Sequence, residues 1–146
     1  MMSNKEIMAK SNSIIALAKE NGLLEVASKI LQKEGDTAEE AKDRLETFLK
    51  SLVISVNEPG LYAYHEYEDK AFHACLLDNQ AFDEVCQKIF GVKIHHMSWA
   101  RLGDELSKHQ KKADALASKY KSIFGNSEML SEGAQVICWD APALAA

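Results

Sequence analysis

Apolar residues recur at steps of three and four along the first ninety residues of the chain, which is the spacing of one face of an α-helix. The first such stretch covers residues 7–31 and is interrupted at Asn21-Gly22, so it forms either two helices or one helix with a weak point. The next helix is predicted to start after Thr37, because Thr37 and Glu40 form a T-x-x-E capping pattern. It should end before Asn57, where a Pro-Gly turn follows.

Two further helices are predicted before Gly91. Residues 61–77 carry a helical apolar stripe, although their tyrosines would also suit a strand, and we expect a helix there. Asn79 is a favourable N-cap for the next helix, which keeps one apolar face until Gly91. The following stretch, residues 92–97, is short and ambiguous.

The most regular pattern begins near Ser98. Apolar positions alternate steps of three and four, as in a heptad seam: Trp99, Leu102, Leu106, His109, Ala113, Leu116, Tyr120 and Ile123. They predict one continuous helix from Ser98 to Phe124, roughly 40 Å long, closed by Gly125. We interpret His109, the one polar member, as a hydrogen-bonded core histidine. The seam can be covered within the chain or by a second copy, so a homodimer is one expected arrangement.

The last twenty residues lack this periodicity. Residues 134–139 are β-branched and aromatic enough for one short strand, and residues 141–146 are expected to form a frayed tail. Leu144, Ala145 and Ala146 resemble the end of the tag that bacterial transfer-messenger RNA adds to stalled chains. This resemblance implies a degradation signal at the carboxyl terminus, and the alternative is an ordinary frayed end.

Composition agrees with one globular domain. The chain has 146 residues, 47% of them hydrophobic, and two prolines, so we expect a mainly α-helical single-domain bundle of five or six helices over residues 1–146. No apolar run is long enough to cross a bilayer, and the N-terminal stretch does not resemble a secretion signal. Cys75, Cys86 and Cys138 are too far apart for a disulfide framework or a zinc knuckle. We therefore expect a soluble cytoplasmic protein with no membrane contact.

The net charge of −5 hides a basic segment. Residues 88–121 contain eight Lys and Arg against three Asp and Glu, whereas both flanking segments are acidic. Residues around Gly91 could form a helix-turn-helix, but Gln87 replaces the small residue of that motif, and Asp104 and Glu105 would lie close to phosphates. Nucleic-acid binding therefore stays a further alternative, and we expect the basic segment to complement an acidic protein surface.

Histidines and a carboxylate suggest a metal or ligand site as a second function. His65, Asp69 and His73 stand four residues apart, but the outer two are about 12 Å apart along a helix, so only a pair could share one ion. His95 could then complete the site. The thirty-residue spacing of His65 and His95 also resembles the distal and proximal histidines of globins, which implies a haem alternative. The competing interpretation is a polar helix flank, in which case no cofactor is expected.

The sequence contains no nucleophile elbow, phosphate-binding loop or dinucleotide fingerprint. Cys75 and Cys86 lie on apolar helical faces, where thiols are ordinarily inert. We therefore expect a non-catalytic protein that binds another macromolecule, a protein above all, in a regulatory, inhibitory or adaptor role. Its contact surface is predicted to combine tyrosines, acids and lysines: Tyr62, Glu66, Tyr67, Glu68, Lys108, Lys111 and Lys112.

Overall fold

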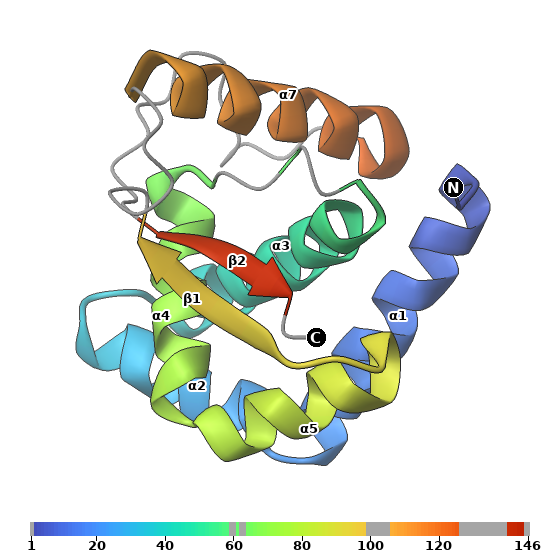
Figure 1. The fold of residues 1–146 in the computed structure, drawn as a ribbon. Helices are drawn as coiled ribbons and strands as arrows, with labels where there is room; N and C mark the ends of the chain where they lie inside the picture. Colours follow the sequence, from blue (N-terminus) through green and yellow to red (C-terminus); the bar gives the residue numbers. More distant parts are fainter. Residues whose placement is uncertain (1, 59–60, 62–63, 99–105, 126–139, 145–146) are drawn as a thin grey trace.

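The fold is mainly helical (Figure 1). The computed structural model describes residues 2–58, 61, 64–98, 106–125 and 140–144. Within these ranges it has six helices, α1 (Asn4–Glu20), α2 (Leu23–Lys33), α3 (Ala38–Asn57), α4 (Glu66–Leu77), α5 (Asn79–Phe90) and α7 (Leu106–Phe124), and two strands, β1 (Ile94–Ser98) and β2 (Asp140–Leu144). The prediction of a mainly α-helical bundle of five or six helices is confirmed. None of these six helices is long and apolar enough to cross a bilayer.

A sharp turn separates α1 from α2, so the first periodic stretch forms two helices. Gly22 has a φ of 87°, a left-handed conformation that favours glycine. Asn21 holds the turn on both sides: its Oδ1 accepts a hydrogen bond from the Leu23 amide at 3.1 Å, and its Nδ2 donates to the Ala81 carbonyl of α5 at 3.1 Å. The turn is thereby tied to α5.

α3 is the central helix of the bundle. It starts with the capping box predicted at Thr37 and Glu40: Thr37 Oγ1 accepts from the Glu40 amide, and the Glu40 carboxylate accepts from the Thr37 amide, each at 3.1 Å. Helices α1, α2, α4 and α7 all pack against α3. More than half of its residues are buried as a result, including the polar residues Arg44, Thr47 and Ser51.

An aromatic cluster joins α3 to α4 and α5. The Phe48 ring stacks on Phe72 with centroids 5.2 Å apart, Tyr64 meets both rings edge-on, and Phe82 of α5 packs beside them. Such pairs add about 0.5–1.5 kcal/mol beyond the burial of their area. The Tyr64 hydroxyl donates to Ser55 Oγ at 3.3 Å, so the polar end of this buried ring is satisfied.

The segment after α5 pairs with the end of the chain, which the sequence did not predict. β1 and β2 form an antiparallel ribbon in which Ser98 lies opposite Asp140. The predicted start of the long helix at Ser98 is therefore wrong, and the described helix runs over Leu106–Phe124, about 28 Å. The heptad pattern could not reveal the strand, because strand pairing depends on a partner more than forty residues away.

The chain end also differs from the expectation. Residues 141–144, predicted as part of a frayed tail, belong to β2, which contacts α3. Pro142 is tolerated there because each strand of a two-stranded ribbon has an edge that needs no N–H donor. The strand predicted over residues 134–139 and residues 99–105 of the predicted long helix lie outside the described residues.

α4 starts later than predicted. It begins at Glu66, and His65 precedes it as an N-cap residue with extended backbone (φ −73°, ψ 164°). Leu61 and Tyr64 therefore lie before the helix and not in it. α5 begins at Asn79 itself, so Asp78 is its N-cap residue and the predicted capping role of Asn79 is wrong.

Candidate functional site

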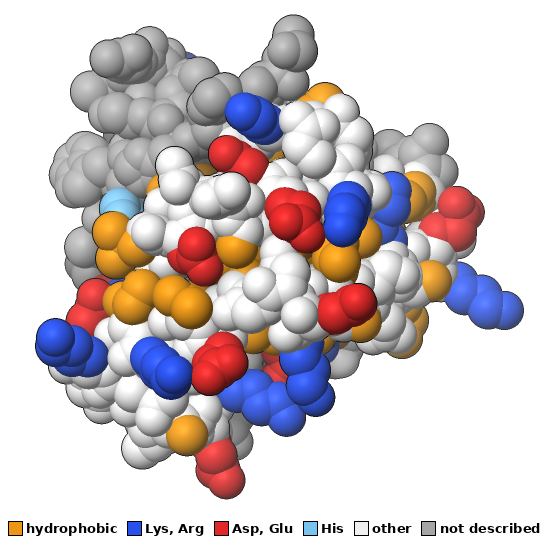
Figure 2. Space-filling model, turned by 90° about the horizontal axis from the view of Figure 1, so that it is seen from below, with side chains coloured by type: hydrophobic (Ala, Val, Ile, Leu, Met, Phe, Trp, Pro, Cys, Tyr) orange, Lys and Arg blue, Asp and Glu red, His pale blue; other side chains and the backbone are white. Residues whose placement is uncertain are grey.

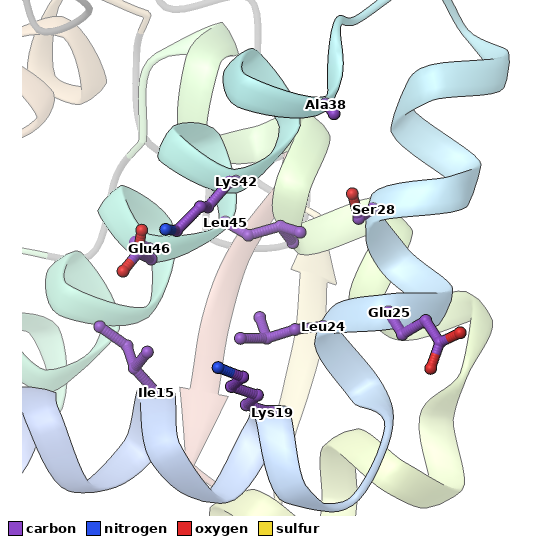
Figure 3. A pocket seen from close by; sticks show the side chains of 9 residues that line it. All are labelled: Ile15, Lys19, Leu24, Glu25, Ser28, Ala38, Lys42, Leu45 and Glu46. Atoms are coloured by element: carbon purple, nitrogen blue, oxygen red, sulfur yellow. The ribbon is translucent and has the colours of Figure 1, made fainter.

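A groove opens between α1, α2 and α3 (Figure 3). Its volume is about 680 Å³. Apolar side chains from all three helices point towards its centre: Ile15 from α1, Leu24 from α2 and Leu45 from α3. Leu45 is buried, whereas Ile15 and Leu24 are only partly buried, so the groove has an apolar floor that solvent reaches.

Charged side chains of both signs line the rim of this groove. Glu25 forms an ion pair with Lys29, whose Nζ lies 3.1 Å from Glu25 Oε1. Lys19 and Lys42 form no ion pair with any residue that the structure describes, and neither does Glu46. The groove therefore offers two ammonium groups and one carboxylate beside an apolar floor.

A second feature is a set of polar side chains, most of them buried, where α3, the start of α4 and α7 meet. We call it the polar seam and define it as Arg44, Thr47, His65, Glu68, Asp114 and Tyr120. His65 is 2% exposed, and its Nε2 lies 3.1 Å from Asp114 Oδ1. Gln110 Nε2 donates to the same oxygen at 3.0 Å. The contact joins the start of α4 to α7, across 49 residues of sequence.

Glu68 is the most unusual member of the polar seam. Its side chain is 1% exposed, and its Oε2 has no hydrogen-bond partner among the described residues. Burial raises the pKa of this carboxyl to about 8, and Asp69 adds to the effect, while the backbone amides of Glu68 and His65 and the charge of Arg44 lower it. The carboxyl is therefore mostly protonated at neutral pH.

Arg44 does not neutralise Glu68, because it is bound elsewhere. Its Nε and Nη2 pair with the two oxygens of Asp36 at 2.8 and 3.1 Å, and its Nη1 donates to the Tyr67 carbonyl at 3.0 Å. The guanidinium also lies over the Tyr67 ring, 4.3 Å from its centroid. The Tyr67 hydroxyl donates to Asp43 at 2.6 Å, and burial followed by this hydrogen bond raises the pKa of Tyr67.

Tyr120 closes the polar seam from α7. It is 5% exposed and hydrogen-bonds with Thr47 of α3. Burial raises the pKa of Tyr120, and the charges of Asp43, Glu68 and Glu46 add to the increase. Tyr120 and Glu68 are therefore close enough to act on each other electrostatically.

The structure does not bring the candidate metal ligands together. His73 Nε2 lies 3.2 Å from Asp69 Oδ2, as the helical spacing allows, whereas His65 turns away to Asp114. Within the described residues, no group of three or more His, Cys, Asp or Glu side chains could hold a metal ion. His95 lies in β1, so it does not occupy the helical position that the globin resemblance implies. The side chains of His95 and His109 are outside the described part of the structure.

The predicted contact surface is divided between the interior and the exterior. Glu68 is buried and Tyr67 is partly buried against Arg44, so neither forms an open surface. Glu66 is exposed, with Lys70 Nζ 3.7 Å from its Oε1. On α7, Lys108 and Lys111 are exposed and Lys112 is partly buried. Tyr62 lies outside the described residues.

The face seen from below carries charges of both signs between small hydrophobic areas (Figure 2). At the chain end, Leu144 pairs with Ile94 in the ribbon, and Ala145 and Ala146 lie outside the described residues. The degradation signal therefore stays a prediction.

The groove and half of the polar seam were not predicted from the sequence. Arg44 could have been noticed, because it stands on the apolar face of its helix, three residues after Ala41 and four before Phe48. Asp114 and the residues of the groove carry no such local signal.

No protein-family model matches this chain, and no curated protein or solved structure was found to match it.

Proposed function

We propose that this protein binds another protein without catalysis, in a regulatory, inhibitory or adaptor role, through the groove between α1, α2 and α3. The observation that carries the proposal is the apolar floor of the groove, where Ile15 and Leu24 are only partly buried and lie beside the buried Leu45. Burying such a floor against a partner gains about 25 cal/mol for each Å² of apolar surface removed from water. A protein segment with its own apolar face is an occupant that gains in this way.

The charges on the rim indicate the chemistry of the partner. Lys19 and Lys42 have no ion pair among the described residues, whereas Glu25 is held by Lys29. A segment with carboxylates beside its apolar side chains would supply counter-charges to both lysines, and Glu46 opposes it with one like charge. We therefore assign the groove to an acidic amphipathic helix of a partner protein.

Photo-crosslinking tests the location of binding. A photoreactive amino acid is placed at Ser28 in the groove or at Gln80, which is exposed on α5 outside it, and both chains are expressed in cells. We expect a defined crosslinked protein from position 28 alone. The crosslink should be lost on Leu24→Asp and kept on Leu77→Asp, because Leu77 is 73% exposed and lies outside the groove. A crosslink that Leu24→Asp leaves intact would overturn the proposal.

A pair of peptides tests the chemistry of the partner. Both are amphipathic helices with leucines at positions i, i+3, i+4 and i+7, and they carry either glutamates or lysines at the flanking positions. In fluorescence anisotropy, the acidic peptide should bind more tightly to the wild-type protein, and the double variant Lys19→Glu, Lys42→Glu should reverse this preference. Equal binding of the two peptides, or a preference that the double variant does not change, would contradict an acidic partner.

A further inference from the structure

The turn between α1 and α2 contains the dipeptide Asn21-Gly22, which occurs once in the sequence. An asparagine followed by glycine is prone to spontaneous deamidation, because the glycine nitrogen can attack the asparagine side-chain carbon without hindrance from a Cβ. Both residues are only partly buried, so water reaches the turn. A chemically reactive pair therefore lies at the junction of two helices.

The side-chain amide of Asn21 is bonded at both ends. Its Oδ1 accepts a hydrogen bond from the Leu23 amide at 3.1 Å, and its Nδ2 donates to the Ala81 carbonyl at 3.1 Å. The orientation of the amide is unambiguous, because the Leu23 N–H can only donate and the Ala81 carbonyl can only accept. One side chain thus closes the turn and ties it to α5.

The folded turn keeps the reacting atoms apart. Deamidation requires the Gly22 nitrogen to lie beside Cβ of Asn21, so that a five-membered ring can close on Cγ. Asn21 has a ψ of 3°, which places this nitrogen beside the Asn21 backbone nitrogen, about 120° away from Cβ around the Cα–C bond. The Gly22 N–H also donates to the Lys19 carbonyl at 3.3 Å. Ring closure therefore requires the turn to open.

We propose that Asn21 is a deamidation site that the folded turn suppresses and that opening of this turn activates. In the open turn the Gly22 nitrogen gives its proton to water and bonds to Asn21 Cγ, the side-chain nitrogen leaves as ammonia, and a succinimide remains. Water then adds to one of the two ring carbonyls and breaks its bond to nitrogen. Addition at Cγ leaves aspartate at position 21, and addition at the backbone carbonyl leaves isoaspartate. Water is the only co-reactant consumed.

The product cannot close the turn as asparagine does. An aspartate keeps the bond with the Leu23 amide, but an oxygen replaces the donor to Ala81, and two acceptors repel at this distance. The new charge follows the C-terminus of α1 and precedes the N-terminus of α2, so the two helix-dipole effects oppose each other. The lost donor therefore decides the outcome, and deamidation loosens the turn from α5. Lys19 and Leu24 on either side of the turn line the groove, so its wall changes as well.

Peptide mapping by mass spectrometry tests the suppression in the full chain. The protein is incubated at pH 8 in buffer and in concentrated guanidinium chloride, and deamidation is followed at Asn21 and at Asn12, which precedes Ser13 inside α1. In denaturant we expect Asn21 to react faster than Asn12, because Ser13 carries a Cβ and glycine does not. In buffer Asn21 should react at least about tenfold more slowly than in denaturant, since only the open turn is reactive.

A variant that mimics the product tests the structural consequence. Hydrogen exchange of the amides of residues 21–26 is compared in the wild type, in Asn21→Asp and in Asn12→Asp, an exposed control on α1. We expect the opening equilibrium of the turn to rise by about tenfold in Asn21→Asp, because a donor facing a carbonyl has been replaced by an acceptor. It should stay unchanged in Asn12→Asp, and exchange in α3 should stay unchanged in both variants.

Four results would overturn the proposal. Equal rates of deamidation at Asn21 in buffer and in denaturant would show that the fold does not suppress the reaction. A rate at Asn21 no higher than at Asn12 in denaturant would show that the pair is not the reactive site. Unchanged exchange of the turn in Asn21→Asp would remove the structural consequence, and an equal rise in α3 would assign it to global unfolding.

Discussion

Arg44 and Asp36 form a two-point ion pair that is almost enclosed by the fold. The Nε–Oδ2 and Nη2–Oδ1 distances are 2.8 and 3.1 Å, and the two side chains are 9% and 14% exposed. Because Arg44 Nη1 also donates to the Tyr67 carbonyl, the Arg44 side chain joins the first half of α3 both to Asp36, the residue before the Thr37 cap, and to the first turn of α4. Arg44, held in place by Asp36, therefore positions the first turn of α4 against α3.

Replacing Arg44 by Met should destabilise the protein strongly. The variant leaves the Asp36 carboxylate without its cation and the Tyr67 carbonyl without its donor, and breaking a buried pair from one side costs roughly 3–5 kcal/mol. We expect a loss of about 3 kcal/mol in urea unfolding, since Asp36 keeps some contact with water. The matched control is Lys29→Met, which breaks the exposed pair with Glu25 and should change the free energy by less than about 0.5 kcal/mol. Similar losses in the two variants would show that the enclosed pair has no special role.

Glu68→Gln should stabilise the protein in a pH-dependent manner. The folded-state pKa is raised to about 8 by burial, so below pH 4.5 the carboxyl is protonated in both the folded and the unfolded chain. Between pH 4.5 and 8 the unfolded chain ionises first, and the wild type loses stability by up to about 1.4 kcal/mol for each pH unit. Glu68→Gln removes this loss. Urea unfolding at several pH values should therefore give similar stabilities near pH 4.5 and a more stable variant at pH 8, and a variant that is less stable at pH 8 would contradict the assignment.

The parts of the fold that sequence patterns predicted are those set by neighbours along the chain. The capping box of Thr37 and Glu40 spans three residues, and the break at Asn21-Gly22 needs only one residue that tolerates a positive φ. The β1–β2 ribbon has no such signal. Its two strands lie more than forty residues apart, and Pro142 in β2 argues against a strand in most settings.

In the polar seam, too, contacts between residues far apart in the sequence could not be predicted from local spacing. Asp69 stands four residues after His65, so helical spacing predicts a contact between them, but His65 lies before the helix and faces Asp114 instead. Asp69 contacts His73, for which the same spacing rule holds. The contact predicted from helical spacing is therefore present between Asp69 and His73, which both lie inside α4. It is absent between His65 and Asp69, because His65 lies before the helix.

The contact between His65 and Asp114 should appear as a positive coupling in a double-mutant cycle. His65→Gln, Asp114→Asn and the double variant are compared by urea unfolding at neutral pH. We expect a coupling free energy of about 0.5–1 kcal/mol, because His65 is buried but Asp114 is 46% exposed and partly screened by water. The same cycle for His73 and Asp69 is the control, and its coupling should be smaller since His73 is half exposed. A coupling of zero at His65 and Asp114 would mean that this contact does not hold α7.

Cys75 and Cys86 should be protected from alkylation in the folded protein. Both thiols are buried, and burial raises the pKa of Cys75 well above its usual range and that of Cys86 to about 12. The thiolate is the reactive form, so at pH 8 its population is lower by about a thousandfold than for a thiol with a pKa near 9. Iodoacetamide labelling of a Cys138→Ser variant, followed by mass spectrometry, should therefore be at least about a hundredfold slower in buffer than in concentrated urea. Rapid labelling of Cys75 under native conditions would show that the C-terminal part of α4 opens to solvent, which the aromatic packing of Phe48 on Phe72 argues against.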